Sequence, residues 1–215
     1  MAKKRFVRPR TKKELENLEV RGLWKAIAQS RELAESGTRI TIEVILELHR
    51  AIFENAIPEI AGRFRANGED VKKLKCHEPP PGRVVKEKIF IFWREFDRRI
   101  SLIRQASHVK DGEEGEWIEE VFDLATWAQH QMTSIHPFCD GNGRMARLMT
   151  NTVLIRFEFP PSPLKFEGEN KSHYLSALCQ IDLHEDYEAL KHIIIKGALQ
   201  TLEKEERARI NARRG

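Results

Sequence analysis

The stretch HPFCDGNGRMAR, residues 136–147, places several side chains that can do chemistry where a loop meets a helix. His136 can accept a proton from a nucleophile at physiological pH, because the ordinary pKa of histidine is about 6.5. Asp140 supplies a lone carboxylate, and Mg²⁺ commonly binds through one or two carboxylates together with substrate phosphates and water. These residue types indicate a magnesium-bound polyphosphate with a base beside it.

Two glycines flank Asn142, directly before the helical pattern resumes at Arg144. Gly141 and Gly143 let successive backbone N–H groups gather into an anion-binding nest, and the start of a helix adds positive charge there. Arg144 and Arg147 share one helix face, because residues three apart are neighbours. Cations at a helix start are disfavoured by the dipole, so this pair indicates an anion bound between them.

Each feature also has an ordinary explanation when it is taken alone. A histidine before a proline is commonly a surface or capping residue, Gly-Asn-Gly is commonly a tight turn, and an arginine pair commonly lies on a solvated face. All three features at this spacing instead indicate phosphoryl or nucleotidyl transfer. The residues alone leave open which phosphorus atom is attacked.

The periodicity of apolar residues predicts a mostly helical chain. Helices are expected over about 14–35, 42–53, 85–100, 117–135, 144–157, 171–181 and 187–207. The fourth of these helices runs into residues 136–147 and the fifth begins within them. Two consecutive helices are therefore expected to position the candidate site.

Residues 62–83 interrupt this helical pattern with three glycines and three consecutive prolines at 79–81. A helix cannot cross such a segment, so we expect a long loop or hairpin, in which the run 71–76 can pair as a strand. Long loops inside compact domains are often functional, and a disordered insertion is the alternative.

The composition is that of a globular protein, with 215 residues, 40% of them hydrophobic and 33% charged. No apolar run approaches the roughly 20 residues needed to cross a bilayer, so we expect no membrane partner. The N-terminus has no apolar stretch typical of a signal peptide, which predicts a cytoplasmic location. Cys76, Cys139 and Cys179 are odd in number and form no CxxC pair, a pattern that favours reduced thiols over a disulfide or zinc site.

The charge balance does not indicate nucleic-acid binding. The net charge is only +4, from 37 basic and 33 acidic residues. Basic residues do gather within residues 3–13 and 207–214, where they can contact phosphates. Solvated, frayed chain ends explain both clusters more simply.

Residues 136–147 resemble the signature of the Fic family, written HxFx(D/E)GNGRxxR, at every specified position. The similarity extends over about residues 40–199, through Leu48-His49-Arg50, the AGRFR run at 61–65, the Pro-Pro-Pro-Gly segment at 79–82 and Tyr174. The resemblance implies an all-α Fic fold with a short β-hairpin flap before the third helix. It also implies a protein adenylyltransferase, which transfers AMP from Mg-ATP to a Ser, Thr or Tyr hydroxyl of a target protein and releases pyrophosphate.

The resemblance assigns a role to each signature residue. His136 is the general base, Asp140 holds Mg²⁺, the loop from Gly141 through Asn142 to Gly143 cradles the phosphates with Asn142 donating to the α-phosphate, and Arg144 and Arg147 hold the β- and γ-phosphates. Tyr174 lines the nucleotide base pocket, with a core aromatic as the alternative. An extended segment of the target docks on the flap by adding a strand, which selects backbone rather than sequence.

Two glycines separate branches within this family. In the Doc-like kinase branch, Ala stands in the place of Gly141 and Lys in the place of Gly143. This chain keeps both glycines, which favours AMP transfer over phosphate transfer.

Many relatives carry an inhibitory helix, (S/T)xxxE(G/N), whose Glu pairs with the second signature arginine. One near match ends in Glu16 followed by Asn but has Lys12 in the Ser/Thr position, and another, around Glu205, lacks the final Gly or Asn. We predict that Glu16 pairs with Arg147 and competes with the γ-phosphate for the same donors. Glu205 and a separate antitoxin protein are the alternatives.

These observations predict three segments: a basic arm with an inhibitory helix at 1–37, a catalytic domain at 38–200 and a charged tail at 201–215. Two other functions remain open. The same site can remove AMP from a modified protein, as a phosphodiesterase, or the chain can be a non-catalytic nucleotide-sensing module. Its oligomeric state, including a homo-oligomer, is also open.

Overall fold

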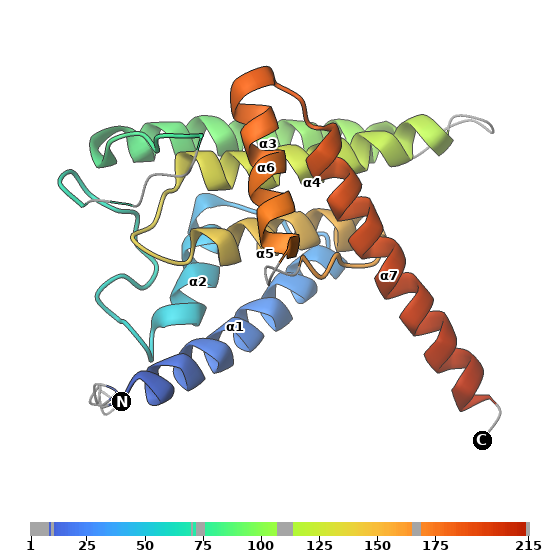
Figure 1. Ribbon diagram of the computed structural model, residues 1–215, viewed down its shortest axis with the longest axis horizontal. Coiled ribbons are helices and arrows are strands. Elements are labelled where there is room, and N and C mark those ends of the chain that lie inside the picture. Colours follow the sequence, from blue (N-terminus) through green and yellow to red (C-terminus); the bar gives the residue numbers. More distant parts are fainter. Residues whose placement is uncertain are drawn as a thin grey trace.

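The computed structural model describes residues 9, 11–69, 71, 76–106, 114–164 and 169–213. These residues form mostly helices, arranged as in Figure 1. In chain order they are α1 (Lys12–Glu35), α2 (Ile42–Phe53), a 3₁₀ turn (Gly82–Val84), α3 (Val85–Ala106), α4 (Glu114–Ile135), α5 (Asn142–Arg156), α6 (Glu169–His184) and α7 (Glu188–Ala212). The predicted helices are confirmed, with ends shifted by a few residues.

The core is built around α4 and α5, which pack side by side. On one side α3 packs against α4, and on the other α1 packs against both α2 and α5. Phe96 of α3, Met132 of α4 and Met149 of α5 are among the fully buried side chains of this core. Burial of such side chains contributes about 1.5–3 kcal/mol each, so the two helices that flank the signature are held firmly.

Gly22 sets how closely α1 approaches α2. A Cβ atom at this position would lie 2.2 Å from the carbonyl oxygen of Ile52, so only glycine allows the two backbones to come together. This close packing holds α1 against α2 and α5.

The N-terminus of α1 is fixed by a capping box, in which Thr11 and Glu14 exchange hydrogen bonds.

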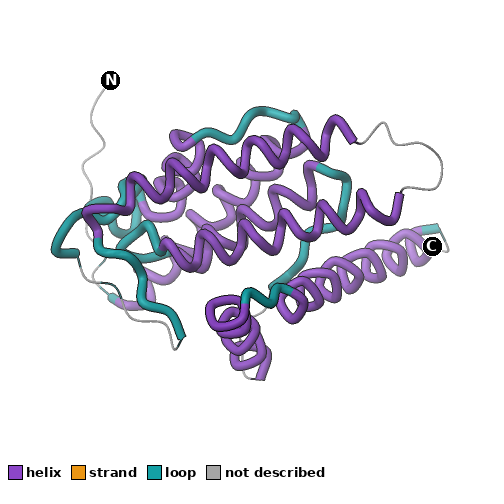
Figure 2. The backbone as a smooth tube through the Cα atoms, turned by 90° about the horizontal axis from the view of Figure 1, so that it is seen from above, coloured by secondary structure: helices purple, strands orange, loops and turns teal. Residues whose placement is uncertain are grey.

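Helix α7 packs against α4 and α6, and α6 is joined to α4 by side-chain hydrogen bonds. Beyond these contacts α7 runs away from the body of the molecule (Figures 1 and 2). The charged tail expected at 201–215 begins within α7, which continues as an exposed helix to Ala212, beyond the predicted helix end at 207. The predicted N-terminal basic arm falls largely on residues 1–8, outside the described residues.

We call residues 62–83 the flap. Its described residues form loops and turns up to the 3₁₀ turn, with an isolated bridge at His77, and Figure 2 shows no strand in the described part of the chain. The predicted β-hairpin is therefore not seen, although most of the run 71–76 lies outside the described residues. We call residues 62–69 the first arm of the flap and residues 76–83 its second arm. Three prolines without N–H donors, at 79–81, explain why the second arm does not pair as a strand.

The prediction of three reduced thiols is wrong. Cys76 in the flap and Cys179 on α6 form a disulfide with a Cα–Cα distance of 5.3 Å, and Cys139 is the free cysteine. The partners are 103 residues apart in sequence, so no local spacing could reveal the pair.

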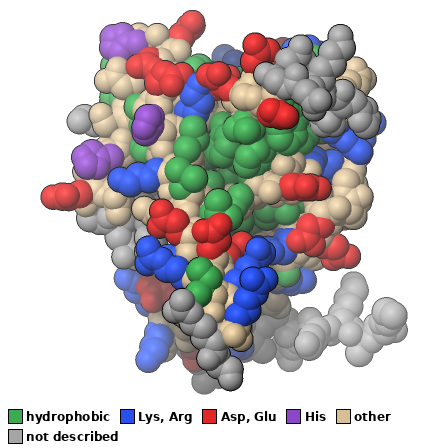
Figure 3. All heavy atoms as spheres, turned by 90° about the vertical axis from the view of Figure 1, so that its right-hand side faces the viewer, with side chains coloured by type: hydrophobic (Ala, Val, Ile, Leu, Met, Phe, Trp, Pro, Cys, Tyr) green, Lys and Arg blue, Asp and Glu red, His purple; other side chains and the backbone are tan. Residues whose placement is uncertain are grey.

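One face of the molecule exposes apolar side chains. Figure 3 shows them gathered in a patch flanked by charged groups, at the opposite end of the molecule from the flap. Exposed large apolar residues include Ile118 on α4 and Leu199 and Leu202 on α7. None of the described helices is both long and apolar enough to cross a membrane.

Candidate active site

The signature loop, residues 136–141, connects the end of α4 to the start of α5. Asn142 closes this loop: its Oδ1 accepts from the Phe138 N–H at 2.9 Å, and its Nδ2 donates to the Phe138 carbonyl at 2.8 Å. The Asn142 side chain is only 3% exposed. The resemblance implied that Asn142 donates to the α-phosphate, whereas here its side chain holds the loop. The backbone N–H groups of the first turn have no acceptor within the helix and remain suited to an anion.

His49 of α2 packs against the signature loop and is hydrogen-bonded to it. Its ring stacks on Phe138 with centroids 3.8 Å apart, Nδ1 accepts from the Gly62 N–H, and Nε2 donates to the Asp140 carbonyl, each at 3.0 Å. Since Nδ1 accepts, Nε2 carries the proton. Burial lowers the pKa of His49 to about 4, so the ring is neutral and its two hydrogen bonds keep fixed directions.

Arg65 joins the flap to the same loop. Its Nε donates to the His136 carbonyl at 2.7 Å, its Nη2 donates to the Pro80 carbonyl, and its backbone N–H donates to the Pro137 carbonyl at 2.9 Å. The side chain is 3% exposed. One buried guanidinium thus fixes the proline segment of the flap relative to the candidate base.

His136 adopts a left-handed backbone conformation, with φ of 49°, directly after α4. Its Nδ1 lies 3.2 Å from the Thr133 carbonyl oxygen, which can only accept, so Nδ1 carries the proton and the lone pair is on Nε2. Burial, with smaller contributions from the charges of Arg65 and His77, lowers the pKa of His136. A neutral ring with a lone pair on Nε2 is the form that a general base requires.

The two signature glycines serve different needs. Gly141 has φ of +82°, and a Cβ atom there would lie 2.5 Å from the Phe53 ring, so the loop requires glycine for both conformation and space. At Gly143 a Cβ atom would meet only the end of the Arg147 side chain, at 3.4 Å. The fold therefore has room for a side chain at position 143. The close approach of a ligand to the backbone would explain why this position is glycine.

Arg144 lies between two carboxylates. Its Nη1 donates to Glu19 Oε2 at 2.6 Å, its Nη2 is 3.5 Å from Asp140 Oδ2, and its guanidinium lies over the Phe53 ring, 4.6 Å from the centroid. The side chains of Arg144 and Glu19 are 19% and 21% exposed. Asp140 is 57% exposed, and its Oδ1 accepts from the Gly141 N–H at 2.5 Å. Glu19 of α1, which lies outside the signature, therefore already binds one of the two signature arginines, Arg144.

The structure does not bring Glu16 to Arg147. Glu16 lies 3.7 Å from Lys12 and is 61% exposed, while Glu19, nearly one turn further along α1, faces the site. Residues three apart share one side of a helix but lie nearly one turn apart along its axis, and only Glu19 lies at the level of Arg144. Glu205 is exposed on α7. Arg147 itself is buried enough to lower its pKa and interacts electrostatically with Tyr174.

Tyr174 belongs to the core. It is 7% exposed, and its hydroxyl accepts a hydrogen bond from Gln129 Nε2 at 2.8 Å. Gln129 in turn accepts from the Thr150 hydroxyl at 2.6 Å, so Tyr174 ties α6 to α4 and α5. This arrangement agrees with the alternative of a core aromatic that stands beside Arg147.

Sequence reasoning quoted His49 and the run that ends at Arg65 as points of resemblance but gave neither a role, and it did not single out Glu19. Both are buried in the structure, where buried polar groups need partners, and the two quoted segments were the signal that could have identified them. Glu19 lies three residues beyond Glu16 and carried no signal of its own.

Comparison with known proteins agrees with this geometry. Residues 39–154 match the model of the Fic/DOC family. Relatives include a protein named protein adenylyltransferase Fic from Nematostella vectensis, 31% identical over 73% of this chain and 33% of that protein. Another of that name, from Drosophila yakuba, is 33% identical over 65% of this chain and 24% of that protein. The chain thus spans a third or less of the length of these relatives.

Solved structures show the same fold. Fic-1 (residues 134–508) from C. elegans aligns with a TM-score of 0.69 and 25% identity, covering 96% of this chain and 55% of that one. A Fic-domain protein from Bacteroides thetaiotaomicron aligns with a TM-score of 0.63 over 81% of this chain, at 22% identity. The signature geometry and the family match lead to one conclusion: the chain belongs to the Fic/DOC family.

Proposed function

We propose that this chain transfers AMP from ATP to a Ser, Thr or Tyr hydroxyl of a protein and releases pyrophosphate. One observation carries the proposal: His136, with its lone pair on Nε2, begins the loop that leads into the start of α5. That helix start has a glycine on each side of Asn142 and carries two arginines. The relatives named protein adenylyltransferase agree with this reaction.

The polyphosphate is proposed to bind at the start of α5. The first-turn N–H groups and the helix dipole attract an anion there, and Gly143 leaves room for it to approach the backbone. Arg144 and Arg147 would hold the β- and γ-phosphates and stabilise the charge that develops on pyrophosphate as it leaves. Because Gly141 and Gly143 are both retained, we favour attack at the α-phosphorus over phosphate transfer.

His136 Nε2 is proposed to take the proton from the acceptor hydroxyl as its oxygen attacks the α-phosphorus. Nδ1–H stays on the Thr133 carbonyl, which orients the ring and stabilises the imidazolium that forms. The Arg65 hydrogen bond to the His136 carbonyl holds the backbone of the base in place during this step.

Asp140 fits a magnesium ion that arrives with the nucleotide. Its carboxylate is more than half exposed, and one carboxylate suffices when phosphates and water supply the other ligands. No group of three His, Cys, Asp or Glu side chains in the described parts of the chain could hold a metal alone. When bound, Mg²⁺ would neutralise charge on the phosphates.

A target protein is proposed to dock in a groove between the two arms of the flap. The groove has a volume of about 670 Å³ and is lined by residues from both arms, among them Arg65, Gly68, Glu78 and Pro81. Since Arg65 also bonds the His136 carbonyl, a segment docked in this groove would lie near the candidate base.

Glu19 is proposed as a restraint on nucleotide binding. While it accepts from Arg144, it occupies a donor that the polyphosphate needs. This proposal transfers the inhibitory role from Glu16 to Glu19 and keeps it within the N-terminal segment, residues 1–37. A separate antitoxin protein is a competing source of such a carboxylate.

We also propose that the protein acts in the cytoplasm, where ATP is supplied, and does not bind nucleic acid. Residues 38–200 are proposed as the catalytic domain and residues 201–215 as a charged tail, which begins within α7. The apolar patch of Figure 3 is the surface where a homo-oligomer would form.

An isotope experiment tests the proposal against its two alternatives. The purified chain is incubated with ATP labelled at either the α- or the γ-phosphate and with synthetic peptides that each carry one Ser, Thr or Tyr. Label from the α position on peptide or on the chain itself supports AMP transfer. Release of AMP from a modified peptide instead supports the phosphodiesterase, and ATP binding without either reaction supports the sensing module.

A further inference from the structure

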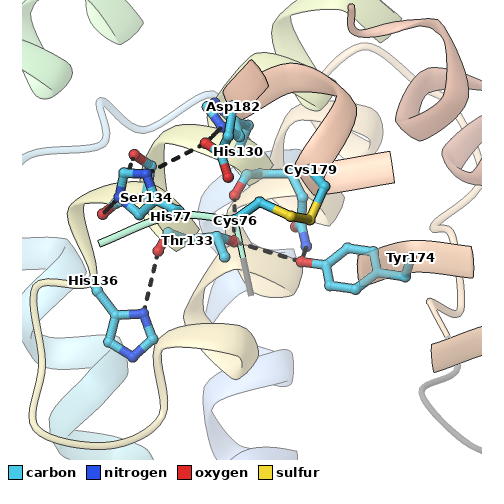
Figure 4. Close-up of polar contacts among 10 residues, drawn as sticks. Cys76, His77, His130, Thr133, Ser134, His136, Tyr174, Cys179 and Asp182 are labelled. Carbon is cyan, nitrogen blue, oxygen red and sulfur yellow. Dashed lines mark hydrogen bonds and ion pairs between the residues drawn. A yellow bond between two sulfur atoms is a disulfide. The ribbon is translucent and has the colours of Figure 1, made fainter. Parts of the chain in front are cut away.

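The flap is fastened to α6 and α4 at one end by a group of contacts that the proposed reaction does not use (Figure 4). Cys76 is bonded to Cys179 of α6. The next residue, His77, donates from Nε2 to the Ser134 carbonyl of α4 at 2.8 Å. One covalent bond and one hydrogen bond therefore attach adjacent flap residues to two different helices.

Asp182 connects these helices to each other. Its Oδ1 accepts from His130 Nε2 at 2.8 Å and lies 3.4 Å from His77 Nδ1, with which it forms an ion pair when the ring is protonated. Both Asp182 and His130 have side chains about 10% exposed. We call Cys76, His77, His130, Cys179 and Asp182 the latch.

The latch and Arg65 hold the second arm of the flap at two points. Arg65 binds the Pro80 carbonyl, and the latch holds Cys76 and His77, only three residues before Pro80. The segment between these points carries Glu78, Pro79 and Pro80, which line the groove proposed for the target. One wall of the groove is thus fixed in part by latch contacts that lie outside the groove.

The same contacts reach the candidate base. Ser134, which accepts from His77, is two residues before His136, and Figure 4 shows the latch beside the end of α4 that carries His136. Displacement of the flap would therefore change the position of a docked hydroxyl relative to His136 Nε2.

Reduction would remove the covalent attachment of the flap and leave it held by the hydrogen bonds of His77 and Arg65, while α6 stays in place. After the disulfide is broken, α6 keeps its hydrogen bonds to α4 through Tyr174 with Gln129 and through Asp182 with His130. Arg144, a proposed phosphate ligand, contacts Glu19, Asp140 and Phe53 and none of the latch residues. The effect should therefore fall on target docking and leave nucleotide binding unchanged.

We propose that the Cys76–Cys179 disulfide is a redox-controlled element of target docking: the disulfide fixes the groove wall for the acceptor, and its reduction by a dithiol loosens that wall. This inference rests on the proposed function. The dithiol gives two electrons and two protons, the S–S bond breaks to two thiols, and the reductant closes to its own disulfide. In a compartment that keeps thiols reduced, such bonds are commonly transient and redox-sensing.

The test compares oxidised and reduced protein directly. The chain is equilibrated in oxidised glutathione or in dithiothreitol, and free thiols are counted by alkylation under denaturing conditions and intact mass. Hydrogen exchange of a peptide covering residues 76–83 then reports the flap without any need for activity. Kinetics with α-labelled ATP and the best acceptor peptide give KM for each substrate.

We expect one alkylated thiol in the oxidised protein and three after reduction, in line with the single free cysteine. Reduction should speed exchange in residues 76–83 and raise the peptide KM about three- to tenfold, with the KM for ATP unchanged. The C76S/C179S double variant should behave like the reduced protein and should not respond to dithiothreitol, which excludes effects through Cys139.

Three thiols in the oxidised protein would overturn the inference, as would exchange that does not respond to reduction. A change in the KM for ATP alone would contradict the docking role. If no α-label is transferred in either redox state, the proposed reaction fails, and the exchange result alone then decides whether the disulfide holds the flap.

Discussion

Glu19 of α1 accepts a hydrogen bond from Nη1 of Arg144 at 2.6 Å, and this ion pair joins the N-terminal helix to the signature. Both side chains are about four-fifths buried. The contact is possible because Gly22, three residues further along α1, lets the helix pack closely on α2. The position of α1 thus determines whether Arg144 is available to a polyphosphate.

Replacement of Glu19 by Ala should raise the affinity for ATP about tenfold. In the wild type the Arg144 guanidinium must give up its hydrogen bond to Glu19 before it can bind a phosphate, and in the variant it need not. Isothermal titration calorimetry with Mg-ATP measures this. Glu16→Ala is the matched control, since Glu16 is on the same helix and 61% exposed, and it should leave the affinity unchanged. Equal affinities for both variants and the wild type would refute the restraint.

The two signature glycines should respond differently to alanine. Gly141→Ala forces a side chain into positive φ and against Phe53, and should lower the free energy of unfolding by at least about 2 kcal/mol. Gly143→Ala should leave that free energy unchanged within about 1 kcal/mol but weaken ATP binding. Thermal denaturation and ATP titration separate the two effects. A folded Gly143→Ala protein that binds ATP normally would contradict a phosphate at this position.

The acidic limb of the pH–rate profile should lie below the ordinary histidine pKa of about 6.5. Burial lowers the pKa of His136, so the ring stays neutral until the pH falls further than it would for an exposed histidine. Activity should therefore be level through neutrality and fall as the pH drops through the lowered pKa. A midpoint above 6.5 for kcat/KM in transfer from α-labelled ATP would show that His136 is not the base.

His49 should make the fold sensitive to mild acid. Its pKa is about 4 in the folded state against an ordinary 6.5, so as the pH falls between these values the unfolded chain takes up a proton that the folded chain does not. The stability present above pH 6.5 is progressively lost, by about 2 kcal/mol at pH 5. Urea denaturation of the wild type and of His49→Gln should show this loss only in the wild type. The same loss in both proteins would assign it to other groups.

The helices could be predicted from sequence because each has an apolar face with a clear period, as along Val85, Ile89, Phe92 and Phe96, all of which are buried. The signature could be predicted because its chemistry is contained in consecutive residues. The Glu19–Arg144 pair could not be predicted from the sequence. A short motif match favoured Glu16, and only the packing of α1 decides which carboxylate faces the site.

Long-range contacts account for the other differences. Arg65 reaches His136, 71 residues away, and the disulfide spans 103 residues, so neither leaves a trace in local spacing. The flap was expected to pair as a hairpin, but its described second arm is held through carbonyls and a disulfide rather than by a ladder of backbone hydrogen bonds.

The central claim is that His136 is the base for AMP transfer, and the Glu19→Ala protein offers the most direct test because its nucleotide site is freed. The rate of α-label transfer from ATP is measured with and without a second substitution, His136→Ala. We predict a decrease of at least about a hundredfold on loss of His136, with ATP binding retained. Transfer at the same rate in both proteins would contradict the account.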